Sequence, residues 1–203
     1  MTAAIHKSVL SEVILPRDGR QAKLVKQIAL VLVGVMLLIL SAKIKIPMIP
    51  VPMTMGTFAV LSIGAAYGPR LGLMTIIGYM IVGALGFDVF ASSSSEVFGV
   101  AYMKGGTGGY LVGYVLAILV LGWTARQGWD RSMFKMAVAM VLGNVVIYVP
   151  GLLWLAAVYE WDQPMLTILN WGLTPFLAGD LVKLGLAALI LPGAWRLVDK
   201  AIK

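Results

Sequence analysis

Apolar stretches long enough to cross a membrane determine what this chain can fold into. The first extends from about Leu24 to Ile44, and a helix of this length spans the ~30 Å hydrocarbon core of a bilayer. Because 60% of the residues are hydrophobic and only 12% are charged, the sequence predicts an all-α integral membrane protein. Five further stretches complete a predicted bundle of six transmembrane helices, at about residues 54–67, 71–87, 110–125, 136–158 and 175–191.

Basic residues are unevenly distributed over the segments between these stretches. Most of the sixteen Lys and Arg residues lie in the two tails, at Arg70 and between Arg126 and Lys135. Six crossings put these segments on one side, and an excess of positive charge marks the cytoplasmic side, so both termini are predicted to be cytoplasmic. Residues 1–23 form the predicted cytoplasmic tail, in which Ile5–Leu15 is either a short surface helix or without regular structure; residues 24–198 form a single transmembrane domain.

Three segments of unusual composition fall on the opposite, outward side. Residues 46–52 contain three prolines and cannot continue a helix, residues 88–107 contain four serines and run into a glycine-rich turn, and residues 160–162 are acidic. An apolar but non-helical segment is tolerated at membrane depth where it lines a cavity. The sequence therefore predicts a ligand pocket that faces outward and is covered by these three segments.

One acid and one base lie inside the last apolar stretch. Asp180 and Lys183 are three residues apart, so on a helix their side chains project from the same face. Ionised groups at membrane depth are costly and usually face the interior of a bundle or a cavity. Two interpretations remain open at this point: a polar binding site, or an ion pair that only holds two helices together.

A pocket with both charges suits a small neutral or anionic ligand that carries N–H donors and carbonyl or carboxylate acceptors. It does not suit a bulk ion, because one acid and one base largely cancel each other. The apolar body of such a ligand needs aromatic walls, and a few polar side chains fix its orientation. The sequence offers several candidates for these contacts, namely Thr54, Tyr79, Tyr110, Tyr148 and Trp154, with Ser92 from the serine run.

Several other functions are excluded by what the sequence lacks. There is no cysteine, and the single histidine, His6, lies in the polar tail, so we expect no metal site, no thiol nucleophile and no hydrolytic enzyme. The glycine-rich turn does not match a nucleotide-binding loop, because Lys104 precedes its glycines instead of following them. The net charge of +7 is accounted for by membrane topology, so nucleic acid is not an expected partner. No cofactor is expected either.

Several motifs, in this order and across the six stretches, resemble one known family. They include Pro50–Thr54, Tyr67–Gly72, Gly83–Gly86 with Val89–Ala91, Gly105–Leu111, Ile147–Tyr148 with Trp154–Leu155, and Thr174–Lys183. The chain resembles the BioY family, the substrate-binding S components of energy-coupling-factor (ECF) biotin transporters. It departs from the family pattern at Gly56, Asp88 and Gly106, where the family usually has Gln, Pro and Pro.

The resemblance implies a six-helix S component in the bacterial cytoplasmic membrane that binds biotin with high affinity from outside. It also implies partners, namely a transmembrane coupling protein and two cytoplasmic ATP-binding subunits, although some members are proposed to work without them. In this picture Asp180 accepts a hydrogen bond from the ureido N–H of biotin, and Lys183 donates to its carbonyl or carboxylate. An S component for a different vitamin and a ligand-free membrane scaffold are the alternatives.

Overall fold

The structure, a computed structural model, describes residues 8–14, 19–46, 53–93, 96–158 and 162–202. This part of the chain is mostly helical, as the sequence predicts. Its helices are α2 (Leu10–Ile14), α3 (Arg20–Lys43), α4 (Gly56–Ala84), α5 (Gly99–Lys104), α6 (Gly108–Arg126), α7 (Met133–Val158), α8 (Met165–Gly172) and α9 (Leu177–Ile202). The short strands β1 (Lys45–Ile46) and β2 (Met53–Thr54) pair antiparallel, and the 3-10 turns η1 (Trp129–Arg131) and η2 (Thr174–Phe176) precede α7 and α9. The predicted proline segment 46–52 lies almost wholly outside the described residues, as do residues 160 and 161 of the acidic segment.

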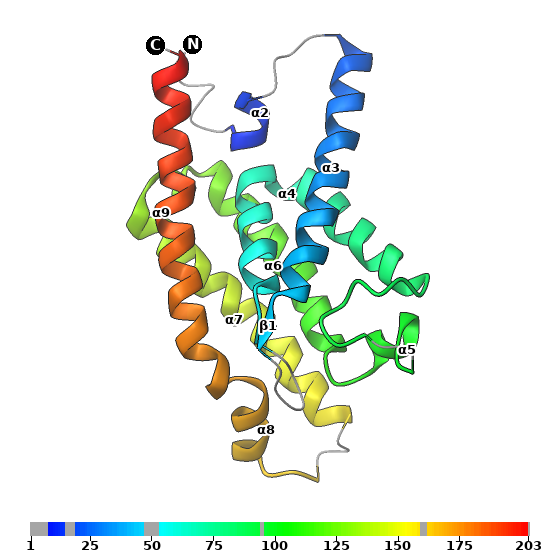
Figure 1. The fold of residues 1–203 in the computed structure, drawn as a ribbon. Coiled ribbons are helices and arrows are strands. Elements are labelled where there is room, and N and C mark those ends of the chain that lie inside the picture. Colours follow the sequence, from blue (N-terminus) through cyan, green and yellow to red (C-terminus); the bar gives the residue numbers. More distant parts are fainter. Residues whose placement is uncertain (1–7, 15–18, 47–52, 94–95, 159–161, 203) are drawn as a thin grey trace.

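Five segments of the described chain are long and apolar enough to cross a membrane: residues 21–43, 56–84, 108–126, 133–158 and 165–200. The second combines two of the predicted stretches, because α4 continues through the predicted break. The break itself is present, since Gly68 has a non-helical backbone (φ 75°, ψ 177°) and Pro69 follows it. Figure 1 shows the two halves of α4 running in different directions from this point.

Large apolar side chains cover the sides of these helices. On α3, for example, Leu32, Met36 and Leu40 are each about 60% exposed. A helix that is apolar on its outer face is stable only where that face meets lipid or another protein. Together with the length of the helices, this exposure identifies a multi-pass membrane protein.

The helices pack in the order α3, α4, α6, α7 and α9, each mainly against the next. Glycines allow the closest approaches: a Cβ atom at Gly113 of α6 would lie 2.7 Å from Ile147 Cα of α7. A Cβ atom at Gly122 of α6 would collide with the backbone of Gly68 and Pro69 at the break in α4. Small residues at such contacts are what permits close helix packing in lipid.

We expect Gly122→Ala to destabilise the protein. Because the colliding atoms are backbone atoms, the added methyl group requires α4 and α6 to separate, and overpacking of this kind costs about 1–3 kcal/mol. Thermal or chemical unfolding in detergent measures the loss. Gly185→Ala on α9 is the matched control, since a Cβ atom there meets nothing within 4 Å. Equal stabilities of the two variants would contradict the packing argument.

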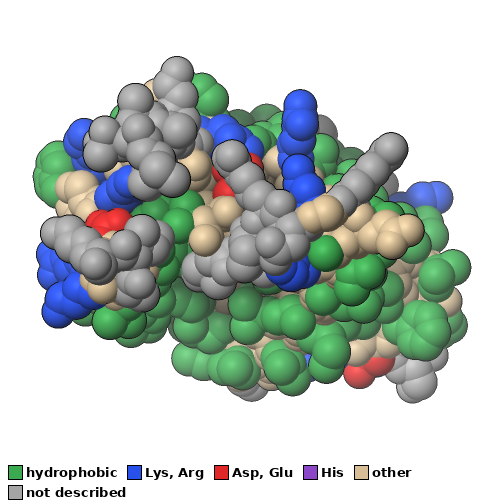
Figure 2. Space-filling view, turned by 90° about the horizontal axis from the view of Figure 1, so that it is seen from above, with side chains coloured by type: hydrophobic (Ala, Val, Ile, Leu, Met, Phe, Trp, Pro, Cys, Tyr) green, Lys and Arg blue, Asp and Glu red, His purple; other side chains and the backbone are tan. Residues whose placement is uncertain are grey.

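The helix α2 lies at the same end of the molecule as the C-terminal end of α9 (Figure 1). Val9, just before α2, packs against Gly68, and Arg126 Nη2 at the end of α6 donates to Glu12 Oε1 over 2.8 Å. Of the two interpretations of Ile5–Leu15, a short helix is present at residues 10–14; its place on the membrane surface stays a prediction. Lys and Arg side chains are spread over this end of the molecule (Figure 2).

A buried carboxyl group lies in the loop at the same end. Asp130 in η1 is 1% exposed and accepts a hydrogen bond from Trp195 Nε1 over 2.5 Å, while its Oδ1 has no hydrogen-bond partner within the described residues. Arg131 stacks over the Trp195 ring, 3.9 Å from its centroid. Burial raises the pKa of Asp130 to about 6, against which the Trp195 hydrogen bond and the charge of Arg131 act only in part.

We expect this carboxyl group to make stability depend on pH. Because the pKa of Asp130 in the folded protein lies above the ordinary value of 3.8, folding favours the protonated carboxyl group. Its contribution to the free energy of unfolding is therefore fully present below about pH 4 and is lost as pH rises through 6. The loss is about 2–3 kcal/mol by linkage. Unfolding midpoints from pH 4 to 8, compared between the wild type and Asp130→Asn, isolate the effect. Parallel profiles for the two proteins would exclude it.

Candidate functional site

Asp180 and Lys183 lie in the first turns of α9, where they are buried at 5% and 6% exposure. Lys183 Nζ donates to Asp180 Oδ1 over 3.0 Å, as their spacing on one helix face predicts. The same ammonium donates to Thr57 Oγ1 of α4 over 2.9 Å, and the hydroxyl of Tyr148 on α7 donates to Asp180 Oδ2. Three helices therefore meet at this ion pair.

A cavity of about 70 Å³ borders the ion pair. Apolar and aromatic side chains form most of its wall, and the polar groups are few, which is the composition typical of small-molecule sites. The lining draws on α3, α4, α5, α6, α7, α9, β2, η2 and the loop after α4. It includes Thr54, Thr57, Tyr79, Tyr102, Tyr110, Tyr114, Tyr148, Phe176, Asp180 and Lys183. The ion pair is thus not sealed between helices but has a hollow beside it.

Tyrosines build the aromatic wall. Tyr110 and Tyr148 meet edge to face, with ring centroids 6.3 Å apart, and Tyr110 donates its hydroxyl to the carbonyl of Gly172 over 2.9 Å. The contact fixes the start of α6 against the end of α8 just before η2. Tyr114 also lines the cavity, one turn after Tyr110 on the same face of α6.

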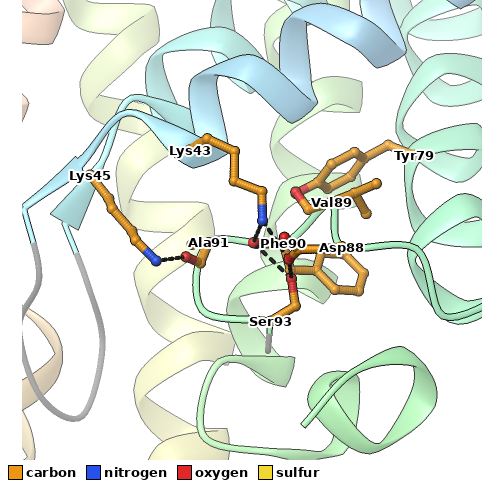
Figure 3. A network of polar contacts seen from close by, with 8 residues as sticks. All are labelled: Lys43, Lys45, Tyr79, Asp88, Val89, Phe90, Ala91 and Ser93. Atoms are coloured by element: carbon orange, nitrogen blue, oxygen red, sulfur yellow. Dashed lines mark hydrogen bonds and ion pairs between the residues drawn. The ribbon is translucent and has the colours of Figure 1, made fainter. Parts of the chain in front are cut away.

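The loop from Asp88 to Ser93 covers the cavity next to α3 and is held by charged side chains (Figure 3). Lys43 Nζ, at the end of α3, donates to Asp88 Oδ1 over 2.6 Å and to the carbonyl of Phe90 over 2.9 Å. Lys45 Nζ donates to the carbonyl of Ala91 over 2.5 Å. The hydrogen bonds from Lys43 and then from Ser93 lower the pKa of the Asp88 carboxyl group.

Phe90 anchors this loop in the bundle. It is 1% exposed, stacks on Tyr102 with ring centroids 4.8 Å apart, and meets Tyr79 edge to face at 5.4 Å. The Tyr79 hydroxyl also donates to the carbonyl of Val89 over 3.1 Å. Phe90 and Ala91 are both part of the cavity wall, so the loop closes one side of the site.

Two residues expected in the site lie outside the cavity wall. Ser92 is exposed, and its neighbour Ala91 lines the cavity instead. Trp154 packs against the backbone of Gly108 and Gly109 and donates from Nε1 to the carbonyl of Gly105 over 2.9 Å. Trp154 therefore holds the glycine-rich turn against α7, which also explains why these glycines are needed.

Other expected residues do border the cavity, and some lining residues were not expected. Thr54, Tyr79, Tyr110 and Tyr148 are in its wall. Thr57, Tyr102 and Tyr114 line the cavity but were not expected there. The four-residue spacing of Tyr114 from Tyr110 is a signal that could have identified it. Nothing in the sequence indicates that Thr57 contacts Lys183, because 126 residues separate the two.

The model of the BioY family matches residues 10–200, which is nearly the whole chain. The chain belongs to the BioY family. Its relatives in the family include a probable biotin transporter BioY of Pyrococcus horikoshii, which is 34% identical over 81% of this chain and 93% of its own length. The biotin transporter BioY of Thermotoga maritima is 32% identical over 76% of this chain and 86% of its own length.

A solved structure supports the fold of this BioY-family chain. The crystal structure of the S component for biotin from an ECF-type ABC transporter superposes with a TM-score of 0.71. The match covers 88% of this chain and 94% of the other, at 22% sequence identity. The two proteins therefore share their helical architecture.

Proposed function

We propose that this chain binds biotin and mediates its uptake across the membrane as the substrate-specific component of an ECF-type transporter. The observation that carries the proposal is the buried Asp180–Lys183 pair beside a tyrosine-lined cavity, in a chain that belongs to the BioY family. The relatives named above as biotin transporters identify the ligand.

The polar groups suit the two ends of the ureido group of biotin. The Asp180 carboxylate accepts hydrogen bonds from N–H groups, and the Lys183 ammonium donates to a carbonyl or carboxylate oxygen. In the structure the two side chains compensate each other over 3.0 Å, and Tyr148 and Thr57 supply further hydrogen-bond partners. Hydrogen bonds to the bound ligand replace some of these contacts, so binding does not leave a buried charge without a partner.

Ligand entry requires the cavity wall to move. The cavity of about 70 Å³ is much smaller than the ~300 Å³ typical of small-molecule sites. Although Phe90 anchors the loop 88–93 in the bundle, the loop is fastened to the end of α3 and to β1 by exposed hydrogen bonds from Lys43 and Lys45, whereas the helices are packed through glycines. We infer that this loop opens to admit the ligand and closes over it.

The proposed topology has six crossings, with the two halves of α4 each crossing the membrane. The non-helical Gly68 supports this, since it divides α4 where α4 meets Val9, the residue just before α2. Both termini are then cytoplasmic, residues 1–23 form the cytoplasmic tail, and residues 24–198 form the transmembrane domain. The site at the start of α9 faces outward, in the bacterial cytoplasmic membrane.

The sequence predicts no ATP-binding motif in this chain. We therefore propose that partner proteins supply the energy for uptake, namely a transmembrane coupling protein and two cytoplasmic ATP-binding subunits. Asp180 and Lys183 act on the ligand by binding alone. Neither a metal nor a cofactor enters the proposal.

A titration of the purified protein with biotin tests the function. We expect saturable binding and a rise of the unfolding temperature, because a ligand present at 100 times its dissociation constant stabilises the folded state by about 2.7 kcal/mol. Thiamine and riboflavin are the competitors. Binding of one of these in place of biotin would make the chain an S component for another vitamin, and no shift with any of the three would favour a ligand-free scaffold.

A further inference from the structure

A second cavity, of about 490 Å³, lies at the end of the molecule that holds α2, away from the site described above. Its walls come from α2, from the beginning of α3, from the middle of α4 beside Gly68 and from the end of α6. The charged side chains in these walls are Lys23, Lys26, Arg70, Arg126 and Glu12. Nothing in the proposed transport of biotin uses this cavity.

The cavity carries an excess of positive charge. Of its four basic side chains, Arg126 is paired with Glu12 over 2.8 Å. Neither Lys23 nor Arg70 has an ion-pair partner within the described part of the chain. Lys23 and Lys26 are one turn apart on α3. Arg70 lies in the first turn of the helical segment of α4 that follows Gly68, and the N-terminus of this segment carries the positive end of its helix dipole. The arrangement favours an anion.

One side of the same cavity is apolar and borders the membrane. Leu30 of α3 and Leu71 and Met74 of α4 line it, and Met74 is 57% exposed. Both helices belong to the segments long enough to cross a membrane. A ligand that fills this space therefore combines an anionic head with an apolar tail.

We propose that this cavity binds an anionic phospholipid, with the phosphate of its headgroup between Lys23, Lys26 and Arg70 and an acyl chain along Leu30 and Met74. The basic end of the molecule in Figure 2 is where such a headgroup meets the protein. Basic pockets between transmembrane helices at the level of the headgroups are a recurrent way of holding anionic lipids. The bound lipid joins α3 to the second half of α4 at this end.

Native mass spectrometry of the detergent-purified protein tests the proposal. The probes are dioleoyl-phosphatidylglycerol, dioleoyl-phosphatidylcholine and inorganic phosphate. We expect retention of phosphatidylglycerol in preference to phosphatidylcholine, and about 25-fold weaker retention by Lys23→Gln/Arg70→Gln, since each basic residue near an anionic headgroup contributes about a factor of five. These two residues are chosen because their removal breaks no ion pair.

The matched control is Arg196→Gln/Lys200→Gln, which removes two exposed basic residues of α9 outside the cavity. We expect this variant to retain phosphatidylglycerol as the wild type does. An equal loss in both double variants would overturn the proposal in favour of general surface charge. Equal retention of the two lipids would also overturn it. Binding of inorganic phosphate as tight as that of phosphatidylglycerol would overturn it in favour of a free anion. Unchanged unfolding temperatures of both variants verify that the fold is intact.

Discussion

We expect Asp180→Asn to weaken biotin binding by about 10-fold to 150-fold. The substitution keeps the shape of the side chain but removes the charge that strengthens the proposed hydrogen bonds to ligand N–H groups, and a hydrogen bond to a charged group contributes about 1.5–3 kcal/mol. Isothermal titration of the purified variant measures the change. We expect Lys183→Ala to weaken binding to a similar degree, because the ligand oxygen loses its ammonium donor.

The control for this prediction is Asp199→Asn, which removes a carboxylate from an exposed position of the same helix. It leaves the cavity untouched, so its affinity for biotin should equal that of the wild type. If Asp180→Asn and Lys183→Ala both bind biotin like the wild type, the two residues do not hold the ligand, whatever the rest of the chain does.

The second large effect concerns the stability of the protein, measured without added biotin. Lys183→Met leaves the buried Asp180 without its cation, and loss of one partner of a buried ion pair costs about 3–5 kcal/mol. Unfolding in detergent without ligand measures this cost. The double variant Asp180→Asn/Lys183→Met removes both charges, and we expect it to regain most of the lost stability.

Lys200→Met is the comparison for the single substitution, because Lys200 lies on the same helix and is exposed. We expect a change within about 0.5 kcal/mol for it. The ion-pair explanation requires Lys183→Met to be milder when Asp180 is already Asn. The same cost in both backgrounds would mean that Lys183 stabilises the protein through packing of its aliphatic chain.

The parts of the fold that could be predicted are those controlled by neighbouring residues. A glycine followed by a proline indicated the break in α4 at Gly68, and the spacing of Asp180 and Lys183 placed both on one face of α9. The resemblance of the motifs to the BioY family is confirmed by the match over residues 10–200. The merging of two stretches into one helix was not foreseen, because only a single residue, Gly68, leaves helical geometry.

The candidate site was less accessible to prediction because its contacts join distant parts of the chain. Thr57 reaches Lys183 across 126 residues, and Tyr148 reaches Asp180 across 32. Tyr148 was expected only as an aromatic wall residue, not as a hydrogen-bond donor to Asp180. Trp154 was expected for its residue type, yet its indole is used to hold the turn at Gly105. Composition identifies which side chains can bind a ligand, whereas helix packing decides which of them do.

Two lysines, Lys43 at the end of α3 and Lys45 in β1 just after it, couple the wall of the cavity to this helix. Lys43 and Lys45 hold Asp88, Phe90 and Ala91 through hydrogen bonds. Among the long helices, α3 packs mainly against α4. Displacement of residues 88–93 by an arriving solute must therefore either rupture these bonds or carry the tip of α3 along. In the second case the filling of the cavity is transmitted to the lipid-facing surface of the molecule, where a neighbouring protein in the membrane can sense it.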